Sequence, residues 1–318
     1  MATNTNINSS YAGEFSSKFI SAALLSGNTL SQGGITIKPN IAFKEVMKKI
    51  ATDDILKDGS CEFDPTSTLT LTERILQPEE FQVNLQLCKK DFVSDWESIQ
   101  MGYSAYKNMP PKFSDFLIGH VAEKVAQRIE TNIWSGTDAT TGQFDGFTTT
   151  LGADADVVDV TGTTVTAANV IDELGSVVDA IPNTVKPQDD LNIYVPSNVF
   201  YAYVRALGGF GAVQNVAGTE NVGGRGANGV DNKGTMWYNN GGLKFDGINL
   251  FLANGLASDK MVAAQKSNLF FGTGLLRDQN EVKVIDMADI DGSQNVRIVM
   301  RMTAGIQHGI GSEIVLYA

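Results

Sequence analysis

Cysteine and histidine are scarce in this sequence, which holds two of each among its 318 residues. Cys61 and Cys88 are too few for a disulfide framework or a thiolate metal site, so we expect two reduced thiols. His120 has Glu123 one helical turn further on, but no second His–Glu pair exists to complete a metal site. His308 lies in a glycine-rich turn with no Cys or Asp beside it in sequence. This scarcity argues against a disulfide-rich secreted protein and a metalloenzyme.

Charged residues are also few, at 19% of the chain, where soluble proteins average about 25%. The net charge is −12, and the 24 Lys and Arg form no run longer than the pairs 48–49 and 89–90. This argues against a dedicated nucleic-acid binder, which gathers basic residues to neutralise phosphates. A low charge often accompanies a surface that faces other protein, but an ordinary domain rich in Gly, Thr and Asn would have the same composition.

Long apolar runs are missing as well. No stretch approaches the ~20 apolar residues of a membrane span. The first residues lack the basic region and apolar core of a signal peptide. We therefore expect no membrane association and a protein made and kept in a cytosol.

Motifs that would carry chemistry are absent or out of context. The string Gly224-x-Gly226-x-x-Gly229 matches a dinucleotide-binding pattern, but no helical pattern follows it. The aspartates of 154–159 could offer oxygens to Ca²⁺ but lack the spacing of a known loop, so a solvated acidic loop is expected. No Gly-x-Ser-x-Gly elbow is present. We expect no catalytic residues, no cofactor and no metal.

Residues 1–40 are polar, with apolar anchors far apart. Tyr11, Phe15 and Phe19 recur at every fourth position, which predicts a short amphipathic helix. Such a segment cannot form its own core, so it must lie on the rest of the chain or on a neighbour, or be disordered.

Residues 66–88 alternate with a period of two. Leu69 and Leu71 alternate with threonines, and a second alternating run covers 81–88 after the Pro-containing segment 77–80. This predicts two half-buried strands around a turn, within a long projecting hairpin somewhere in 50–88.

The strongest helical pattern covers 113–134, where apolar residues recur every four positions between Pro110-Pro111 and Gly136. Its 22 residues would make a rod of roughly 33 Å. Residues 137–165 are then predicted to form an irregular connection. After it we predict a helix (167–181), a buried strand (191–195), a helix (198–207), glycine-rich loops (208–247), a two-residue hairpin turn at 245–248, alternating strands from 280 and a last strand at 313–317.

The order of these elements resembles the Hong Kong 97-like fold of tailed-phage major capsid proteins. Local segments are similar to that family too. The segment 130–136 looks like its acidic-to-glycine end of a spine helix, 144–147 like the glycine-containing segment that follows, 195–201 like its strand-to-helix step, and 243–252 like its later hairpin. Two weaker likenesses, at 11–15 and 88–92, are to capsid proteins of phages that infect Bacteroidota.

The resemblance implies an α+β protein with five regions. They are an N-terminal arm (1–40), an extended hairpin loop with its base (41–90), a peripheral domain with the spine helix (91–160, helix 113–134), an axial domain (161–270) and closing strands of the peripheral domain (271–318).

The function implied is structural: a capsid protein that self-assembles into an icosahedral shell around double-stranded DNA. The implied partners are further copies in hexamers and pentamers, a separate scaffolding protein, a portal, and decoration or vertex proteins. The DNA would be enclosed without sequence-specific binding, and the virion capsid would assemble in the cytoplasm of a bacterial host.

We expect six residues on the arm and the hairpin to contact neighbouring subunits: Tyr11, Phe15, Phe19, Leu69, Leu71 and Arg74. For the aromatic arm residues, packing on the chain's own surface is nearly as good an interpretation. Two other functions remain open at this point. One is an encapsulin-like nanocompartment shell, and the other is a Gly/Thr-rich carbohydrate-binding or hydrolytic protein.

Overall fold

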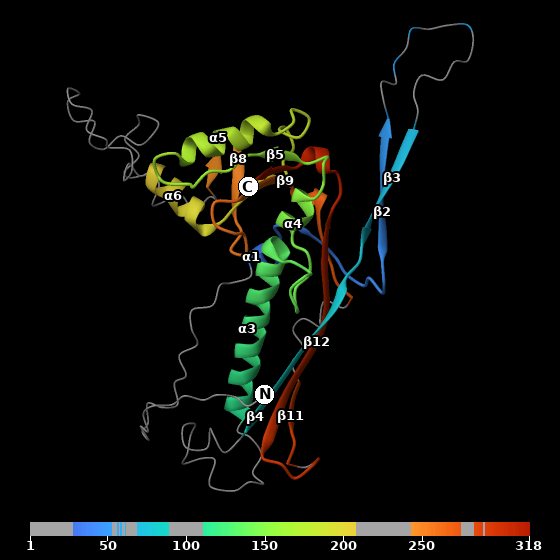
Figure 1. Ribbon diagram of the computed structural model, residues 1–318, viewed down its shortest axis with the longest axis vertical. Helices are drawn as coiled ribbons and strands as arrows, with labels where there is room; N and C mark the ends of the chain where they lie inside the picture. The colour runs from blue at the N-terminus through green and yellow to red at the C-terminus, as the bar shows by residue number, and fades with distance from the viewer. Residues whose placement is uncertain are drawn as a thin grey trace, which may run out of the picture.

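The computed structural model describes residues 28–52, 56, 58, 61, 69–88, 111–207, 243–274, 283–288 and 290–318. It has a lobe built on a mixed sheet, a long helix that runs away from this lobe beside long strands, and a two-stranded hairpin that projects from the junction (Figure 1). Among the described residues, no helix is both long enough and apolar enough to cross a membrane.

The lobe contains a six-stranded sheet in the order β5-β13-β9-β6-β8-β7. These strands are β5 (Val158–Val160), β13 (Val315–Tyr317), β9 (Met261–Gln265), β6 (Leu191–Val195), β8 (Ile248–Leu252) and β7 (Lys244–Phe245). Helices α5 (Val170–Ala180) and α6 (Ser197–Leu207) pack on one face of the sheet. Between β7 and β8, Asp246 and Gly247 both have positive φ (47° and 85°), which is the conformation of a two-residue type I′ turn.

Both faces of this sheet are buried. Ile193, Met261 and Val315 point into a core shared with α5 and α6. Tyr194 and Val262, one residue along in the same strands, belong to a second core shared with the long helix. Side chains on a strand alternate between the two faces of its sheet. The lobe sheet therefore joins two hydrophobic cores, and its central strands are apolar at almost every position.

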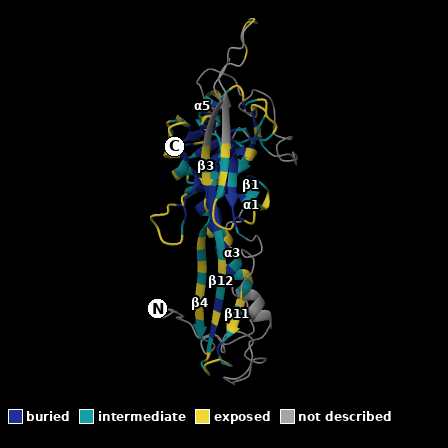
Figure 2. Cartoon of the chain, turned by 90° about the vertical axis from the view of Figure 1, so that its right-hand side faces the viewer, coloured by how far each residue is buried: buried dark blue, intermediate teal, exposed yellow. Residues whose placement is uncertain are grey.

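The second core lies along helix α3 (Pro111–Ser135). It is covered by a sheet of β1 (Thr36–Lys38), β10 (Leu269–Gly272), β12 (Asn295–His308), β11 (Lys283–Asp286) and β4 (Glu79–Cys88). Val121, Val125 and Ile129 of α3 lie in one cluster with Ile298 and Met300 of β12. In the first half of β12, from 295 to 301, buried positions alternate with intermediate or exposed ones (Figure 2). The short helices α1 (Asn28–Ser31) and α4 (Phe147–Gly152), and 3-10 turns at Lys266–Asn268 and Gly311–Glu313, complete this half.

Most of the predicted elements are confirmed. The helix predicted at 113–134 spans 111–135, the strand at 191–195 is found with those bounds, and the helices predicted at 167–181 and 198–207 begin and end within three residues of their predicted limits. The turn at 245–248 and the alternation of β12 are also confirmed. The glycine-rich loops up to 242 and the segment 1–27 lie outside the described residues.

The predicted pairing around Pro78 is wrong. The strands on either side of it, β3 (Leu69–Leu76) and β4, do not pair with each other. β3 pairs antiparallel with β2 (Glu45–Thr52) to form the projecting hairpin, and β4 pairs with β12 through ten register positions. At Pro78 the chain runs on from hairpin to sheet instead of turning back (Figure 1). Alternation fixes which face of a strand is apolar but leaves its partner open.

Two further expectations need correction. The connection predicted over 137–165 contains α4 and the strand β5. The last strand, β13, was expected among the closing strands of the peripheral domain, but it pairs with β5 and β9 in the lobe sheet. All three residues of β13 are buried, because the strand lies between two others and has one core on each face. Leu316 belongs to one core, and Val315 and Tyr317 belong to the other.

Candidate assembly site at the base of the hairpin

The hairpin formed by β2 and β3 exposes one apolar cross-strand pair near its base. Val46 and Ile75 are directly opposite each other in the register, and their exposed fractions are 47% and 45%. Phe43, just before β2, is 71% exposed. Within the described part of the chain no third strand pairs with these two. A two-stranded ribbon is marginal by itself in water, so these side chains are available for another surface.

The base of the hairpin is fixed to the rest of the chain by apolar and backbone contacts. Leu76 is fully buried and packs closely on Gly272 of β10, where an added Cβ would lie 3.0 Å from the Leu76 Cγ atom. The Gln307 Nε2 amide donates a hydrogen bond to the Ile75 carbonyl oxygen at 3.0 Å. These contacts join the last two residues of β3 to β10 and β12.

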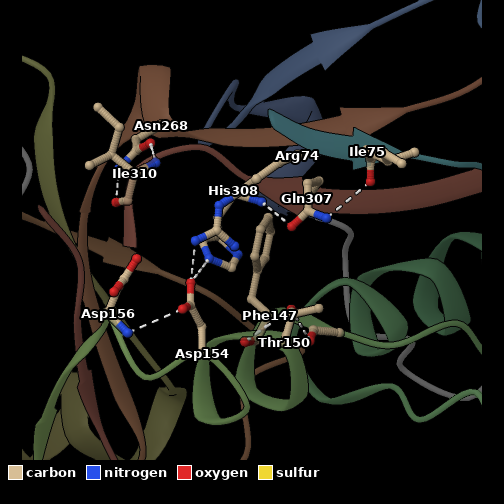
Figure 3. Close-up of polar contacts among 11 residues, drawn as sticks. Arg74, Ile75, Phe147, Thr150, Asp154, Asp156, Asn268, Gln307, His308 and Ile310 are labelled. Carbon is tan, nitrogen blue, oxygen red and sulfur yellow. Dashed lines mark hydrogen bonds and ion pairs between the residues drawn. The ribbon is translucent and has the colours of Figure 1, made fainter. Parts of the chain in front are cut away.

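Three charged or titratable side chains meet beside these contacts (Figure 3). Arg74 of β3 forms an ion pair with Asp154, with Nη2 and Oδ2 2.5 Å apart. The His308 Nε2 atom, at the end of β12, lies 2.8 Å from the same Asp154 oxygen. The backbone N–H of Asp156 donates to the other oxygen, Oδ1, at 3.1 Å. One carboxylate thus connects the hairpin, the loop after α4 and the long strand.

The electrostatics of this cluster favour an ionised Asp154 and a neutral His308. Burial acting alone would raise the pKa of Asp154, but hydrogen bonds from His308, Asp156 and Arg74 outweigh it and lower the pKa to about 2. Burial lowers the pKa of His308, and the positive charge of Arg74 lowers it further, against the opposing effect of Asp154. A neutral imidazole that donates from Nε2 leaves Nδ1 as an acceptor, and the buried Nδ1 has no hydrogen-bond partner among the described residues.

A cavity of about 600 Å³ opens next to the cluster, between the hairpin and the ends of β10 and β12. Lys38, Lys48 and Arg74 give its lining a basic character, against the single acid Glu313. The Lys38 ammonium forms an ion pair with Glu45 and lies over the Phe270 ring, 4.9 Å from its centroid. The cavity is an open groove between hairpin and body, with positive charge on both sides.

A second cavity, of about 580 Å³, lies between α5 and α6 and is acidic. Asp172, Asp179 and Asp246 line it, and the Tyr203 hydroxyl donates to the Lys244 carbonyl oxygen at 3.0 Å. Nowhere in the described part of the chain do three His, Cys, Asp or Glu side chains gather in a way that could hold a metal ion.

A buried glutamate joins the first described residues to the long helix. Glu130, 1% exposed, accepts hydrogen bonds from the Thr29 N–H at 3.1 Å and from the Thr29 hydroxyl at 2.5 Å. The Trp134 indole N–H donates to the Thr29 Oγ1 atom at 2.7 Å. Burial raises the pKa of Glu130 in spite of these hydrogen bonds. At Gly255 a Cβ would lie 1.9 Å from the Glu130 carbonyl oxygen, so the backbone there requires glycine.

The sequence-predicted contact residues fall into three groups. Tyr11, Phe15 and Phe19 lie outside the described residues. Leu69 and Leu71 lie in β3, opposite Thr52 and Ile50 in the register with β2.

Arg74 is paired with Asp154 within its own chain, so its expected contact with a neighbouring subunit stays a prediction. Sequence reasoning missed that His308 has an aspartate partner, because the two residues are 154 positions apart and no local pattern links them. His120, by contrast, lies on α3 as expected.

The comparisons with known proteins identify the fold. No protein-family model matches this sequence, and no curated protein matches it. Solved structures do. The capsid of a native GTA particle aligns with a TM-score of 0.62 and 14% identity over 95% of this chain and 93% of that one. The capsid of Myoviridae phage XM1 aligns with a TM-score of 0.57 and 12% identity over 100% and 98%. The satellite phage P4 procapsid, which includes a size determination (Sid) protein, aligns with a TM-score of 0.51 and 10% identity over 91% and 96%. The chain therefore has the α+β Hong Kong 97-like capsid fold.

Proposed function

We propose that this chain is the major capsid protein of a tailed phage, a structural subunit that assembles with copies of itself into an icosahedral shell. The observation that carries the proposal is the capsid fold over nearly the full length of both chains in each alignment. Because sequence identity is low, this likeness supports a shared architecture and does not transfer individual residues.

The geometry supports an assembly role in a specific way. The hairpin projects from the body and presents Val46 and Ile75 at its surface, where no strand of the described ranges covers them. We propose that this face, together with Leu69, Leu71 and Arg74, packs on a neighbouring subunit. The aromatic residues of the arm, Tyr11, Phe15 and Phe19, would do the same. Apolar area buried in this way contributes about 25 cal/mol per Å² to association.

The division of the chain into lobes suggests how the shell would be arranged. We propose that the lobe sheet with α5 and α6 forms an axial domain around five-fold and six-fold centres, in pentamers and hexamers. Helix α3 and the long strands would form the peripheral domain between these centres. Ring contacts of this kind are heterologous, so the angle between subunits decides whether the shell closes.

The remaining partners follow from a shell of this kind. The P4 procapsid contains a size determination protein besides its capsid subunits. We propose that a separate scaffolding protein likewise guides this chain, with a portal at one vertex and decoration or vertex proteins elsewhere. The net charge of −12 fits enclosure of double-stranded DNA without specific binding. Assembly would take place in the cytoplasm of a bacterial host, before the shell becomes part of the virion.

Electron microscopy of the purified full-length chain tests the proposal. The protein is expressed alone and together with a candidate scaffolding protein, and particles are examined by negative stain. Closed icosahedral shells with pentamers and hexamers are the expected result. A chain that stays monomeric under every assembly condition and binds a carbohydrate or turns over a substrate would overturn it.

The contents of the particles separate the two kinds of shell. Particles from infected cells that contain double-stranded DNA and a portal would support the phage capsid. Particles that contain an enzyme and no DNA would instead identify a nanocompartment shell and contradict the phage assignment.

A further inference from the structure

We infer that Asp154 and His308 are positioning residues for the hairpin, and that protonation of His308 releases its base from the body of the subunit. The inference concerns how the hairpin is held in one subunit. Its consequence for contacts between subunits rests on the proposed assembly function.

The hairpin is attached to the body at both of its strands. Before β2, the Ile41 N–H donates to the Thr273 carbonyl oxygen at 3.1 Å, and Lys38 pairs with Glu45 at the start of β2. The end of β3 makes three further contacts. Leu76 inserts against Gly272, the Ile75 carbonyl accepts one hydrogen bond from Gln307, and Arg74 pairs with Asp154. The residue before Arg74, Glu73, is exposed, as is Lys48 opposite it. On the β3 side the hairpin is therefore held by three consecutive residues, and Arg74 is the outermost of them.

Asp154 can hold Arg74 only because other groups fix its carboxylate. The Asp156 backbone N–H binds Oδ1, and His308 binds Oδ2, the same oxygen that Arg74 contacts. The His308 side chain is 2% exposed, whereas that of Arg74 is 29% exposed. The imidazole is thus the buried support of the carboxylate, and the guanidinium is its solvent-facing partner.

The charged groups that face His308 come from two other elements: Arg74 from β3, and Asp154 from the loop after α4, where Asp156 also lies. With a neutral imidazole the charges of Arg74 and Asp154 cancel. A proton added to Nδ1 would be placed on a buried atom that has no acceptor in the part of the chain that the structure describes, and it would leave the cluster with one excess positive charge beside Arg74. An unsatisfied buried donor costs about 1–3 kcal/mol, so the protonated state favours opening of the cluster.

The sign of the pH effect follows from the same geometry. The pKa of His308 is lower in the folded chain than its ordinary value of 6.5, so the contribution of the neutral imidazole is fully present above pH 6.5. It is lost as the pH falls through the lowered pKa. Asp154, with its pKa at about 2, stays ionised throughout this range and does not cause the change.

Hydrogen exchange of the full-length, unassembled chain tests the inference. Exchange of the backbone amides of 73–76 is measured by mass spectrometry at pH 7.5 and pH 5.5, and wild type is compared with H308Q at each pH so that the intrinsic pH dependence cancels. Gln keeps an N–H donor for Asp154 but does not titrate. We expect protection in wild type to fall by about threefold to tenfold relative to H308Q at pH 5.5, and the two to agree at pH 7.5.

The second histidine provides the matched control. His120 is the only other histidine in the sequence and lies on α3, so H120Q should keep the full pH response of wild type. D154N should lose protection at both pH values, because it removes the charge that holds Arg74. An equal pH response in wild type and H308Q would overturn the inference.

These outcomes are independent of the proposed function. A pH response in a chain that never forms particles would keep the inference and contradict the capsid proposal. Particles formed by a chain that lacks the pH response would support the capsid proposal and contradict the inference.

Discussion

The lobe sheet and the hairpin differ in how completely their β-strands are buried. In the lobe, β6 and β9 are covered on both faces, and Ile193, Tyr194 and Met261 are fully buried. In the hairpin, β2 and β3 pair only with each other within the described residues, and the pair Val46 and Ile75 remains about half exposed. The lobe completes its own core, whereas the hairpin presents an apolar pair that the described residues leave uncovered.

This difference separates the stability of the subunit from the stability of a shell. Residues of the lobe should control unfolding of the single chain. Residues of the hairpin should control association and leave the single chain almost unchanged. The following substitutions test whether the lobe and the hairpin differ in this way.

The largest effect is expected on assembly, from the double variant V46T/I75T. Both changes keep β-branched side chains but remove apolar surface from the exposed face. If each side chain contributes about 1 kcal/mol to a contact between subunits, the concentration needed for assembly should rise by roughly thirtyfold. Light scattering across a concentration series measures this threshold.

The swapped variant V46I/I75V is the matched control, because it exchanges the two cross-strand partners and keeps the apolar surface. Its threshold should match wild type. The thermal unfolding temperature of both unassembled variants should stay within about 2 °C of wild type. A large fall in that temperature would show that the hairpin stabilises its own chain, which would contradict the proposed difference between hairpin and lobe.

The next effect is expected on folding, from L174A in the lobe. Leu174 is fully buried between α5 and the lobe sheet, so the truncation should lower the free energy of unfolding by about 2–5 kcal/mol. Urea titration followed by circular dichroism measures this change. L85A makes the same truncation at a position of β4 that is 45% exposed and should cost less than about 1 kcal/mol. Equal losses in the two variants would contradict the comparison.

A smaller effect is expected from T29V, at the junction of α1 with α3. Valine keeps the shape of threonine but removes the hydroxyl that donates to Glu130 and accepts from Trp134. The loss should be about 1–3 kcal/mol at pH 7 in the same urea titration. Because burial already raises the pKa of Glu130, the loss should shrink as the pH falls and the carboxyl takes up a proton. T29S restores the hydroxyl and should recover most of the stability.

Local sequence patterns were enough to predict many of the elements, although not α4 or β5, and they did not predict which strands pair. The four-residue spacing of α3, the apolar run of β6 and the Asp246-Gly247 turn each depend on neighbours in sequence, and each was predicted correctly. The pairing of β3 with β2 was not, because an alternating strand is equally apolar on its inner face whichever strand lies beside it. The place of β13 in the lobe sheet was missed for the same reason.

The hairpin site shows the same limit in its chemistry. The alternation of residues 66–88, and Leu69, Leu71 and Arg74 as contact candidates, were predicted from the sequence. The partners of Arg74 were not, since Asp154 lies 80 positions away and His308 another 154 beyond it. No periodicity relates residues on three separate elements.

From the sequence alone we could predict an α+β protein with a long spine helix, alternating strands and no recognisable catalytic motif. These features are predictable because helix and strand periods, turn residues and motif spacings depend on residues close together in the chain. Only the tertiary structure decided which strands pair, that Glu130 is buried under Thr29, and that one carboxylate joins Arg74 to His308. Those features depend on contacts between distant segments, whose energies arise only once the two cores have formed.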